Sequence, residues 1–369
     1  MDFEIGEKEQ ALRDEIRRFA KEELPEGWVG PTPLDVGECR DWEVEKSIAK
    51  KLAQKGWLVM SWPKEYGGQD ASPSELTVYE IEVAYYQIPG AGMGISGVRW
   101  VGPSLMLFGT EEQKKKYLPA FCDDKYKAAT AALIEPRFNF DPLDLSTTAK
   151  LDGSNYVLNG EKCYVPMAAE ADLLLVYAAE NGNCQGFILE KGAPGLEIGE
   201  REKNMGIKAL PTYELTFKDC RIPKENRLGG EAGCDYNRIL NRSRVALSAM
   251  AVGVARASFE YARDYAKDRN AFGEPIASRQ AVAFMIAENA IEVDATRLMT
   301  WEAAWKLDRK EDATKEASLM KMYADDMVLM VTDRGVQVLG GHGYIREHPV
   351  ELWLRNGRGF TTFNGMAIV

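Results

Sequence analysis

Residues 145–165 read LSTTAKLDGSNYVLNGEKCYV, and their pattern indicates a pair of β-strands. Residues that favour strands fill the two halves, Leu145–Leu151 and Tyr156–Val165, and Asp152-Gly-Ser separates the halves as a tight turn would. Other short β-rich runs, punctuated by Gly, Asn, Asp and Pro, surround this pair. They are Ala128–Ile134, Asp172–Ala179, Gly186–Leu189 and Tyr213–Cys220. We therefore predict a compact antiparallel, barrel-like β domain over residues 123–230.

Helical patterns precede this β domain. Apolar residues recur at near-helical spacing within residues 5–24. Further helices are predicted at Trp42–Gln54, Ser74–Tyr86 and Glu111–Phe121. The last of these follows Thr110, a residue type that caps helix N-termini, and it starts with two glutamates. Residues 1–122 are thus a predicted N-terminal helical domain.

Long helices follow the β domain. Leu247, Met250, Val254 and Tyr261 mark one amphipathic face of a helix that begins near Asp235. Two more long helices are predicted at Ala281–Leu307 and Asp312–Val338. Helices of this number and length predict a C-terminal four-helix bundle over residues 231–369. The predicted fold is therefore mainly α with a central β domain.

Composition excludes several classes of protein. The chain has 369 residues, of which 45% are hydrophobic and 28% charged, as is usual for a soluble globular protein of two or three domains. Its 46 Lys and Arg against 57 Asp and Glu give a net charge of −11, which repels nucleic-acid phosphates. The longest apolar run, near Ala246–Ala255, is too short to span a bilayer. We therefore expect neither a nucleic-acid partner nor membrane insertion.

Cysteine and histidine usage narrows the chemistry. The six cysteines form no Cys-x-x-Cys pair, which predicts free thiols in a reducing compartment. The two histidines, His342 and His348, are too few for a His-ligated metal or a Ser-His-Asp triad, so we expect no metal site. The acidic, polar N-terminus MDFEIGEKEQ does not read as a signal peptide. We therefore expect a cytoplasmic protein.

Several motifs resemble those of the acyl-CoA dehydrogenases, and they occur in that family's order along nearly the whole chain. They are WPKEYGG (62–68), FGTEEQKKKYLP (108–119), Ile134-Glu135-Pro136 with Asp141 and Thr148-Ala149, NGEK (159–162), DRNAFGEPI (268–276) with Gln280, and QVLGGHGY (337–344). No single motif is decisive, but their order and spacing together are specific.

The resemblance implies a reaction and a cofactor. In this family a carboxylate removes the α-proton of an acyl-CoA while the β-hydride passes to FAD, which leaves an α,β-unsaturated thioester. The electrons then leave to an electron-transfer flavoprotein. The resemblance thus implies an oxidoreductase that acts on CH–CH bonds, in β-oxidation or in another route of lipid or steroid catabolism.

The positions where the family carries its catalytic base are changed in this chain. The Y-E-G-T motif of most members is matched by Phe363-Asn364-Gly365-Met366, which places an amide at the base position, Asn364. Some relatives carry the base on the first bundle helix instead, just before a retained arginine. The base position on that helix matches Ser243 and the retained arginine matches Arg244, so the second position carries no carboxylate either. We therefore predict no catalytic residue, and a substrate-binding role for Arg244.

The flavin cradle that the resemblance implies is changed as well. Its Gly-rich loop reads Arg137-Phe138-Asn139-Phe140, which is bulky. Ile134 replaces a threonine that bonds the flavin ring, and Phe140 replaces a serine that meets the pyrophosphate. Pro166 removes a hydroxyl and a backbone N–H from the neighbouring strand. The chain's own hold on FAD is therefore predicted to be weak.

A second set of positions is filled as the family requires. Family members bind FAD across a subunit interface, where the neighbour contacts the pyrophosphate, the flavin and the adenine end. The residues that match those contacts are Arg269, Phe272, Gln280, Gln337, Gly340 and Gly341, which we call the lending set. The chain is thus interpreted as the non-catalytic subunit of a heteromeric acyl-CoA dehydrogenase, an α2β2 heterotetramer. Bacterial enzymes of this kind act on steroid and other bulky acyl-CoAs.

Other interpretations stay open at this point. The chain could be a homomeric FAD-containing acyl-CoA dehydrogenase with an unconventional base, a lyase or desulfinase on the same fold, or a structural pseudoenzyme. Single residues also have plainer roles. Arg269 could form a surface ion pair, Gly340-Gly341 could permit close packing or a turn, Arg244 could hold the bundle together, and His342 could serve the fold alone.

Overall fold

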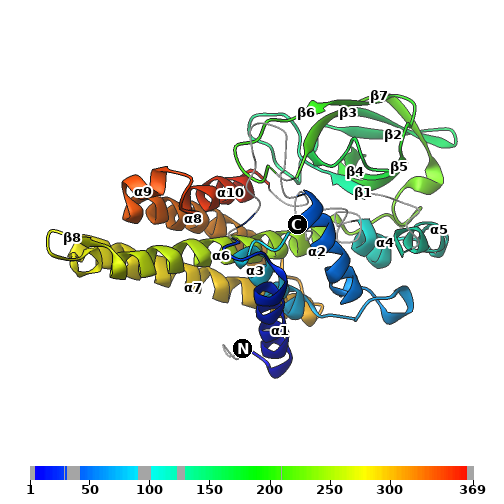
Figure 1. The fold of residues 1–369 in the computed structure, drawn as a ribbon. Helices are drawn as coiled ribbons and strands as arrows, with labels where there is room; N and C mark the ends of the chain where they lie inside the picture. Colours follow the sequence, from blue (N-terminus) through cyan, green and yellow to red (C-terminus); the bar gives the residue numbers. More distant parts are fainter. Residues whose placement is uncertain are drawn as a thin grey trace.

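The computed structural model describes residues 5–28, 30, 42–89, 101–122, 129–208 and 210–363. The β domain lies at one end of the molecule next to α4 and α5, and the long helices of the C-terminal part run side by side away from it (Figure 1). This arrangement confirms the predicted fold class. The exact domain boundaries, at residues 122/123 and 230/231, stay a prediction.

The N-terminal part is helical where the sequence predicts helices. It contains α1 (Glu7–Glu23), α2 (Trp42–Gln54), α3 (Pro73–Tyr85), α4 (Gly102–Phe108) and α5 (Glu111–Cys122). The predicted N-cap of α5 is confirmed, because the Thr110 hydroxyl accepts from the backbone N–H of Gln113 while the Gln113 side chain accepts from that of Thr110. The short helix α4 was not predicted.

The β domain is one seven-stranded sheet. Its strands are β1 (Ala129–Ala132), β2 (Thr148–Asp152), β3 (Asn155–Pro166), β4 (Leu173–Glu180), β5 (Asn183–Glu190), β6 (Leu196–Arg201) and β7 (Thr212–Pro223). Their order is β1-β4-β2-β3-β7-β6, and β5 pairs with β4. The predicted hairpin of β2 and β3 is confirmed, with Leu151 opposite Tyr156 and a turn at Gly153.

The antiparallel prediction needs one correction. β1 pairs with β4 in parallel, and one residue pair joins β2 to β4 in parallel too. A whole hairpin lies between β1 and β4 in the chain, so β4 can return beside β1 in the same direction. All other pairs in this sheet are antiparallel.

The C-terminal part is a bundle built around one central helix. It contains α6 (Tyr236–Asp268), α7 (Gln280–Asp308), α8 (Thr314–Leu339), the short α9 (Gly341–Tyr344) and α10 (Val350–Thr362), with a small hairpin of β8 (Asn270–Ala271) and β9 (Glu274–Pro275) after α6. α6 packs against α3, α7, α8 and α10. A Cβ at Gly253 would overlap the carbonyl oxygen of Ile81, so glycine lets α6 approach α3 closely.

A buried charge network joins the first and last parts of the chain. Glu82 of α3 is fully buried and lies 3.1 Å from Arg17 of α1 and 2.9 Å from Arg256 of α6. Burial would raise the pKa of Glu82, but the hydrogen bonds and charges of Arg256 and Arg17 outweigh it and hold that pKa below its ordinary value. None of the helices in the described ranges combines the length and hydropathy needed to cross a membrane.

Candidate functional site

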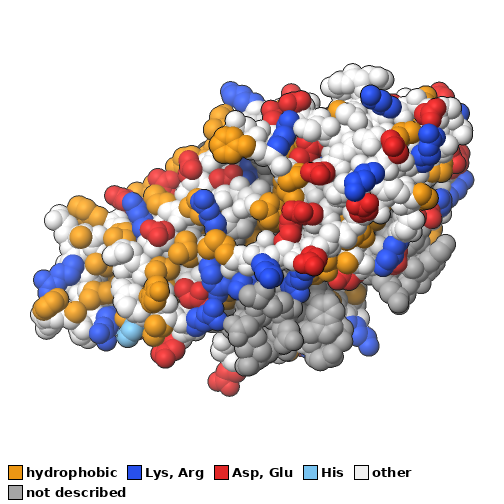
Figure 2. Space-filling model, turned by 90° about the horizontal axis from the view of Figure 1, so that it is seen from above, with side chains coloured by type: hydrophobic (Ala, Val, Ile, Leu, Met, Phe, Trp, Pro, Cys, Tyr) orange, Lys and Arg blue, Asp and Glu red, His pale blue; other side chains and the backbone are white. Residues whose placement is uncertain are grey.

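The lending set lies at the far end of the bundle from the β domain, around the β8–β9 hairpin (Figure 1). Arg269 ends α6, Phe272 occupies the hairpin tip and Gln280 begins α7, while Gln337 lies in the last turn of α8, just before Gly340 and Gly341. All six residues are exposed. Hydrophobic side chains stand among Lys and Arg on this end of the surface (Figure 2).

Three members of the set line one hollow of about 370 Å³. Arg269, Gly340 and Gly341 share it with side chains of the bundle such as Tyr265 and Ile276. The Arg269 guanidinium forms no hydrogen bond or ion pair with any residue in the described ranges. The alternative that Arg269 serves only as a surface ion pair therefore finds no acidic partner among these residues. An uncommitted guanidinium in an open hollow suits a diphosphate, which it can bind through two hydrogen bonds.

The two glycines of the hollow differ in what they require. Gly340 has φ of 59° and ψ of −128°, a conformation that only glycine adopts readily, so the turn explains it. Gly341 has no positive φ, and a Cβ there would meet no atom within 4 Å. Packing among the described residues therefore does not require glycine at Gly341, whereas close approach by another molecule would.

The ring of Phe272 is almost fully exposed, and the guanidinium carbon of Arg279 lies 5.9 Å from its centre. Phe272 is 96% exposed, with a φ of 55°, at the hairpin tip. The hairpin itself is braced, because the N–H of Ile276 donates to the carbonyl of Arg269 at 2.9 Å and Arg279 pairs with Glu274 at 3.0 Å. A braced hairpin that presents an uncovered aromatic ring is typical of a contact surface.

The two histidines of the chain lie under this end of the bundle. Their rings stack at a centroid distance of 5.2 Å and an interplanar angle of 13°. The hydroxyls of Tyr265 and Tyr261 on α6 are hydrogen-bonded at 2.8 Å to Nδ1 of His342 and of His348, respectively. The pair thus fastens the segment after α8 to α6, which agrees with a structural role for His342.

Of the two predicted base positions, one lies among the residues that the structure describes. Ser243 is 2% exposed on α6, and Asn364 lies outside the described residues. Arg244 donates through Nη1 to the Ser318 hydroxyl of α8 at 2.9 Å, and burial lowers its pKa. Arg244 therefore ties α6 to α8, and its contact with a substrate stays a prediction.

The cradle loop is anchored by a buried ion pair. Lys162 is fully buried and donates to the Glu135 carboxylate and to the carbonyl of Leu133, both at 2.9 Å. Glu135 also accepts from the backbone N–H groups of Ser146 and Thr147 at 2.7 and 2.8 Å. Burial lowers the pKa of Lys162 to about 8 against the opposing effect of Glu135. Burial opposes ionisation of Glu135 too, but Lys162 and the two N–H groups hold its pKa below the ordinary value.

The residues substituted in the flavin cradle have few side-chain groups that could form hydrogen bonds with a flavin. Ile134 is 5% exposed within the core, and Phe140 is half-buried against the same core. Phe138 is 95% exposed, so it does not fill the space that the loop surrounds. Pro166 ends β3 opposite Thr212. No side-chain hydroxyl or amide stands at Ile134, Phe140 or Pro166, so these residues do not fit FAD in the way that the resemblance implies.

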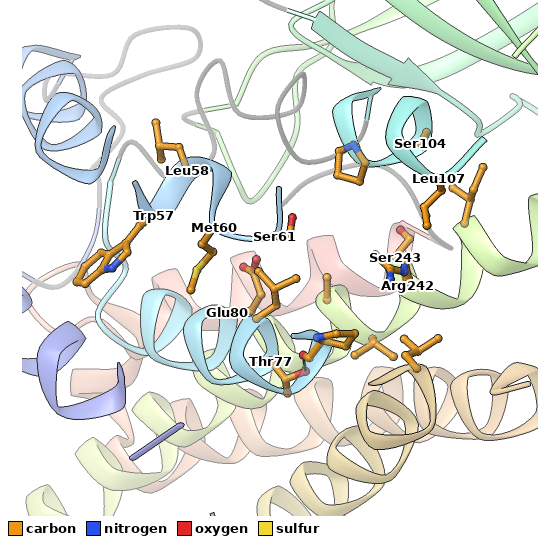
Figure 3. Close-up of a pocket in the computed structure, with 17 residues that line it drawn as sticks. Trp57, Leu58, Met60, Ser61, Thr77, Glu80, Ser104, Leu107, Arg242 and Ser243 are labelled. Carbon is orange, nitrogen blue, oxygen red and sulfur yellow. Dashed lines mark hydrogen bonds between the residues drawn. The ribbon is translucent and has the colours of Figure 1, made fainter. Parts of the chain in front are cut away.

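One further cavity, which the sequence did not predict, lies between α3, α4 and α6 (Figure 3). Its volume is about 110 Å³, and its walls are mostly apolar. Four residues of α6 that line it follow a helical spacing: Ile239, Arg242, Ser243 and Ala246. A lone arginine on that face is the only signal that the sequence offered.

Comparison with known proteins identifies the family. Three family models match the chain in succession: acyl-CoA dehydrogenase N-terminal domain over residues 6–125, middle domain over 130–220 and C-terminal domain over 235–367. The chain therefore belongs to the acyl-CoA dehydrogenase family. FAD is the cofactor typical of this family, whose members are oxidoreductases.

Individual relatives match over almost the whole chain. The mitochondrial short-chain specific acyl-CoA dehydrogenase of Mus musculus is 33% identical over 96% of this chain and 86% of its own length. A subunit of the caffeyl-CoA reductase–Etf complex of Acetobacterium woodii, CarC, is 34% identical over 99% and 96%. Among solved structures, butyryl-CoA dehydrogenase from Megasphaera elsdenii matches with a TM-score of 0.81 and 27% identity, over 100% of this chain and 97% of that one.

Proposed function

We propose that this chain is the non-catalytic subunit of a heteromeric, FAD-dependent acyl-CoA dehydrogenase that desaturates an acyl-CoA thioester. Family membership and the relatives that act on acyl-CoA support the reaction class. FAD, when bound, accepts the hydride from the substrate. The contribution of this chain is to bind and orient part of that cofactor for a neighbouring subunit.

The observation that carries the proposal is the state of the lending set. Arg269 has no partner in the described part of the chain, Phe272 is 96% exposed, and Gly341 leaves open space in the hollow that it shares with Arg269. None of these features serves a contact within the described residues. They suit the diphosphate, the ring and the adenine end of a cofactor that a neighbour holds. In this proposal Gln280 and Gln337 add polar contacts at the adenine end.

The chain's own site supports the same conclusion. Ser243 places a buried hydroxyl where some relatives carry the base, and a hydroxyl does not take up a proton near neutral pH. Asn364, at the other position, is an amide. The base and a flavin cradle with its hydrogen-bond donors would therefore come from the partner subunit, while Arg244 would contact the acyl-CoA.

Exposed hydrophobic side chains on the bundle support a surface for assembly. Phe284 and Ile291 of α7 and Met322 of α8 are large hydrophobic side chains that stand exposed. Exposed apolar side chains gathered on neighbouring helices mark subunit contacts. We infer that this face packs against another subunit, and that an electron-transfer flavoprotein receives the electrons. The relative from Acetobacterium woodii is named as part of an Etf complex, which supports that second inference.

The test is a titration of FAD into the purified partner subunit, with and without this chain. The wild-type chain should tighten FAD binding, and Arg269→Ala should reverse most of that gain, by about tenfold or more for a lost charge-assisted contact. Lys267→Ala, on the same exposed turn of α6, is the matched control and should have little effect. Tight FAD binding by this chain alone, insensitive to Arg269, would favour a homomeric dehydrogenase or a lyase or desulfinase instead.

A further inference from the structure

The two ring nitrogens of His342 have different surroundings. His342 lines the same hollow as Arg269 of the lending set. Its Nδ1 is hydrogen-bonded to the hydroxyl of Tyr265 at 2.8 Å. Its Nε2 forms no hydrogen bond with any described residue, and it is not a buried atom. One nitrogen therefore serves the fold, and the other is left to contact a ligand in the hollow.

The ring of His342 is held in a fixed position. It stacks on His348, with the ring centres 5.2 Å apart, and the ring of Tyr265 meets it edge-on at 5.9 Å. Behind it, a Cβ at Gly343 would overlap the carbonyl oxygen of Val336, so glycine lets α9 lie directly against α8. A ring that is already ordered loses little conformational freedom when it binds a ligand.

The hydrogen bond with Tyr265 determines what Nε2 can do. The phenol proton of Tyr265 has no other acceptor among the described residues, so we assign the hydroxyl as the donor and Nδ1 of His342 as the acceptor. The neutral ring then carries its hydrogen on Nε2. A protonated ring carries hydrogen on both nitrogens, and the hydroxyl of Tyr265 then accepts from Nδ1. Nε2 is therefore a hydrogen-bond donor in both states.

The charged groups around the two histidines provide no acidic partner for them. Neither ring pairs with a carboxylate among the described residues, and Arg269, at the end of α6, adds positive charge to the hollow. Charged side chains on the elements around α9 are either ion-paired or exposed: Arg334 with Glu288, Arg355 with Glu351 and Arg279 with Glu274 are paired, while Asp333, Arg346 and Glu347 are exposed. Negative charge beside His342 must therefore come from a ligand.

We propose that His342 is a second diphosphate ligand beside Arg269, and that binding of the diphosphate is linked to the uptake of a proton by the stacked histidines. The negative charge of a diphosphate attracts a protonated imidazole as it attracts a guanidinium. Since like charges on stacked rings repel, we expect the pair to gain one proton and not two. The inference rests on the proposed function, in which the FAD of the partner subunit brings the diphosphate into the hollow.

The experiment measures the dissociation constant of FAD from the assembled complex at about pH 6 and about pH 8, a range in which histidine side chains change charge. His342→Asn keeps an oxygen near the position of Nδ1, which can accept from Tyr265, but it removes the donor at Nε2. His348→Asn makes the same change in the ring that does not line the hollow, so it is the matched control. Arg269→Ala tests the proposed function in the same assay.

Wild type and His348→Asn should bind FAD at least about fivefold more tightly at about pH 6 than at about pH 8. His342→Asn should lose most of this difference and bind FAD about tenfold more weakly than wild type at about pH 6. An unchanged pH difference in His342→Asn, or none in wild type, overturns the inference. If Arg269→Ala still weakens FAD binding in those cases, the proposed function stands without it. If Arg269→Ala has no effect, the proposed function fails and the inference fails with it.

A measurement on the wild-type complex avoids dependence on the folding of a variant. Calorimetric titration of FAD at about pH 7, in two buffers of different ionisation enthalpy, counts the protons taken up on binding. The inference predicts net uptake, and no uptake contradicts it. If the two histidines served the fold alone, His342→Asn and His348→Asn would lower the melting temperature alike and leave the pH dependence of FAD binding unchanged.

Discussion

Replacing Phe272 by alanine tests whether the chain serves a neighbour's cofactor or its own. Phe272, in the lending set, is 96% exposed, and Phe138, in the cradle loop, is 95% exposed. Neither ring is covered by the described part of the chain. Phe272→Ala and Phe138→Ala should therefore each change the free energy of unfolding of the isolated chain by less than about 0.5 kcal/mol.

The two variants should differ in the assembled complex. If Phe272 is buried against the partner's FAD, its removal gives up about 1.5–3 kcal/mol of burial, which is about tenfold to hundredfold in the dissociation constant of FAD. Phe138 belongs to a cradle whose donor positions hold Ile134, Phe140 and Pro166, so its removal should change FAD binding by less than about twofold.

The assay is fluorescence titration of FAD into the apo form of each complex, after equal melting temperatures of the isolated chains have been established. The reasoning is refuted if Phe138→Ala releases the flavin while Phe272→Ala does not, because the chain would then hold FAD in its own cradle. Equal losses of FAD affinity in both variants would also contradict the proposal that the chain only contributes to the FAD site of a partner. They would indicate a homomeric enzyme in which both sites bind FAD.

Four further variants test the packing and charge arguments. Glu82→Gln removes the buried ion-pair partner of Arg13, Arg17 and Arg256 and should destabilise the chain by about 3–5 kcal/mol at neutral pH. Because the folded-state pKa of Glu82 lies below its ordinary value of 4.5, its stabilising effect is full above that value and is lost as the pH falls through the folded pKa, so chemical denaturation from pH 3 to 7 should give a flatter profile for the variant. Lys162→Met removes the nearer of two cations from the buried Glu135 and leaves Arg137 at 3.8 Å, so it should cost about 3 kcal/mol, measured by urea denaturation; a neutral result would contradict the anchoring of the cradle loop. Gly341→Ala should leave the melting temperature unchanged while weakening FAD binding by the complex, whereas Gly253→Ala, which brings a methyl group against the α3 backbone, should lower the melting temperature. A fall in stability for Gly341→Ala would mean that the chain itself needs that glycine.

Local patterns in the sequence were sufficient for most of the fold. α2 has the predicted bounds, and α7 and α8 begin and end within two residues of their predictions. β6 (Leu196–Arg201) was missed because charged residues and Gly199 interrupt its pattern and most of its residues are not buried. α10 was missed because Gly357 and Gly359 weaken its helical signal, and tertiary packing of Leu352, Trp353 and Phe360 overrides it.

Features that depend on distant parts of the chain could not be predicted. The parallel pairing of β1 with β4 is set by how the whole sheet closes, and it leaves no mark in either strand. Motif matching could name Arg269 and Gly341. Only the folded molecule shows that, among the residues the structure describes, Arg269 has no partner and a Cβ at Gly341 would meet no atom within 4 Å. The same is true of the cavity at Arg242, which exists because α3 and α4 lie against that face of α6.

The most direct test of the central claim is the flavin content and native mass of this chain, first alone and then co-expressed with an acyl-CoA dehydrogenase chain that carries the base. The account predicts no bound flavin in the chain alone, and one flavin for each pair of unlike chains in the complex, with acyl-CoA oxidation only by the complex. One flavin per chain in a homomeric preparation that oxidises an acyl-CoA would contradict it.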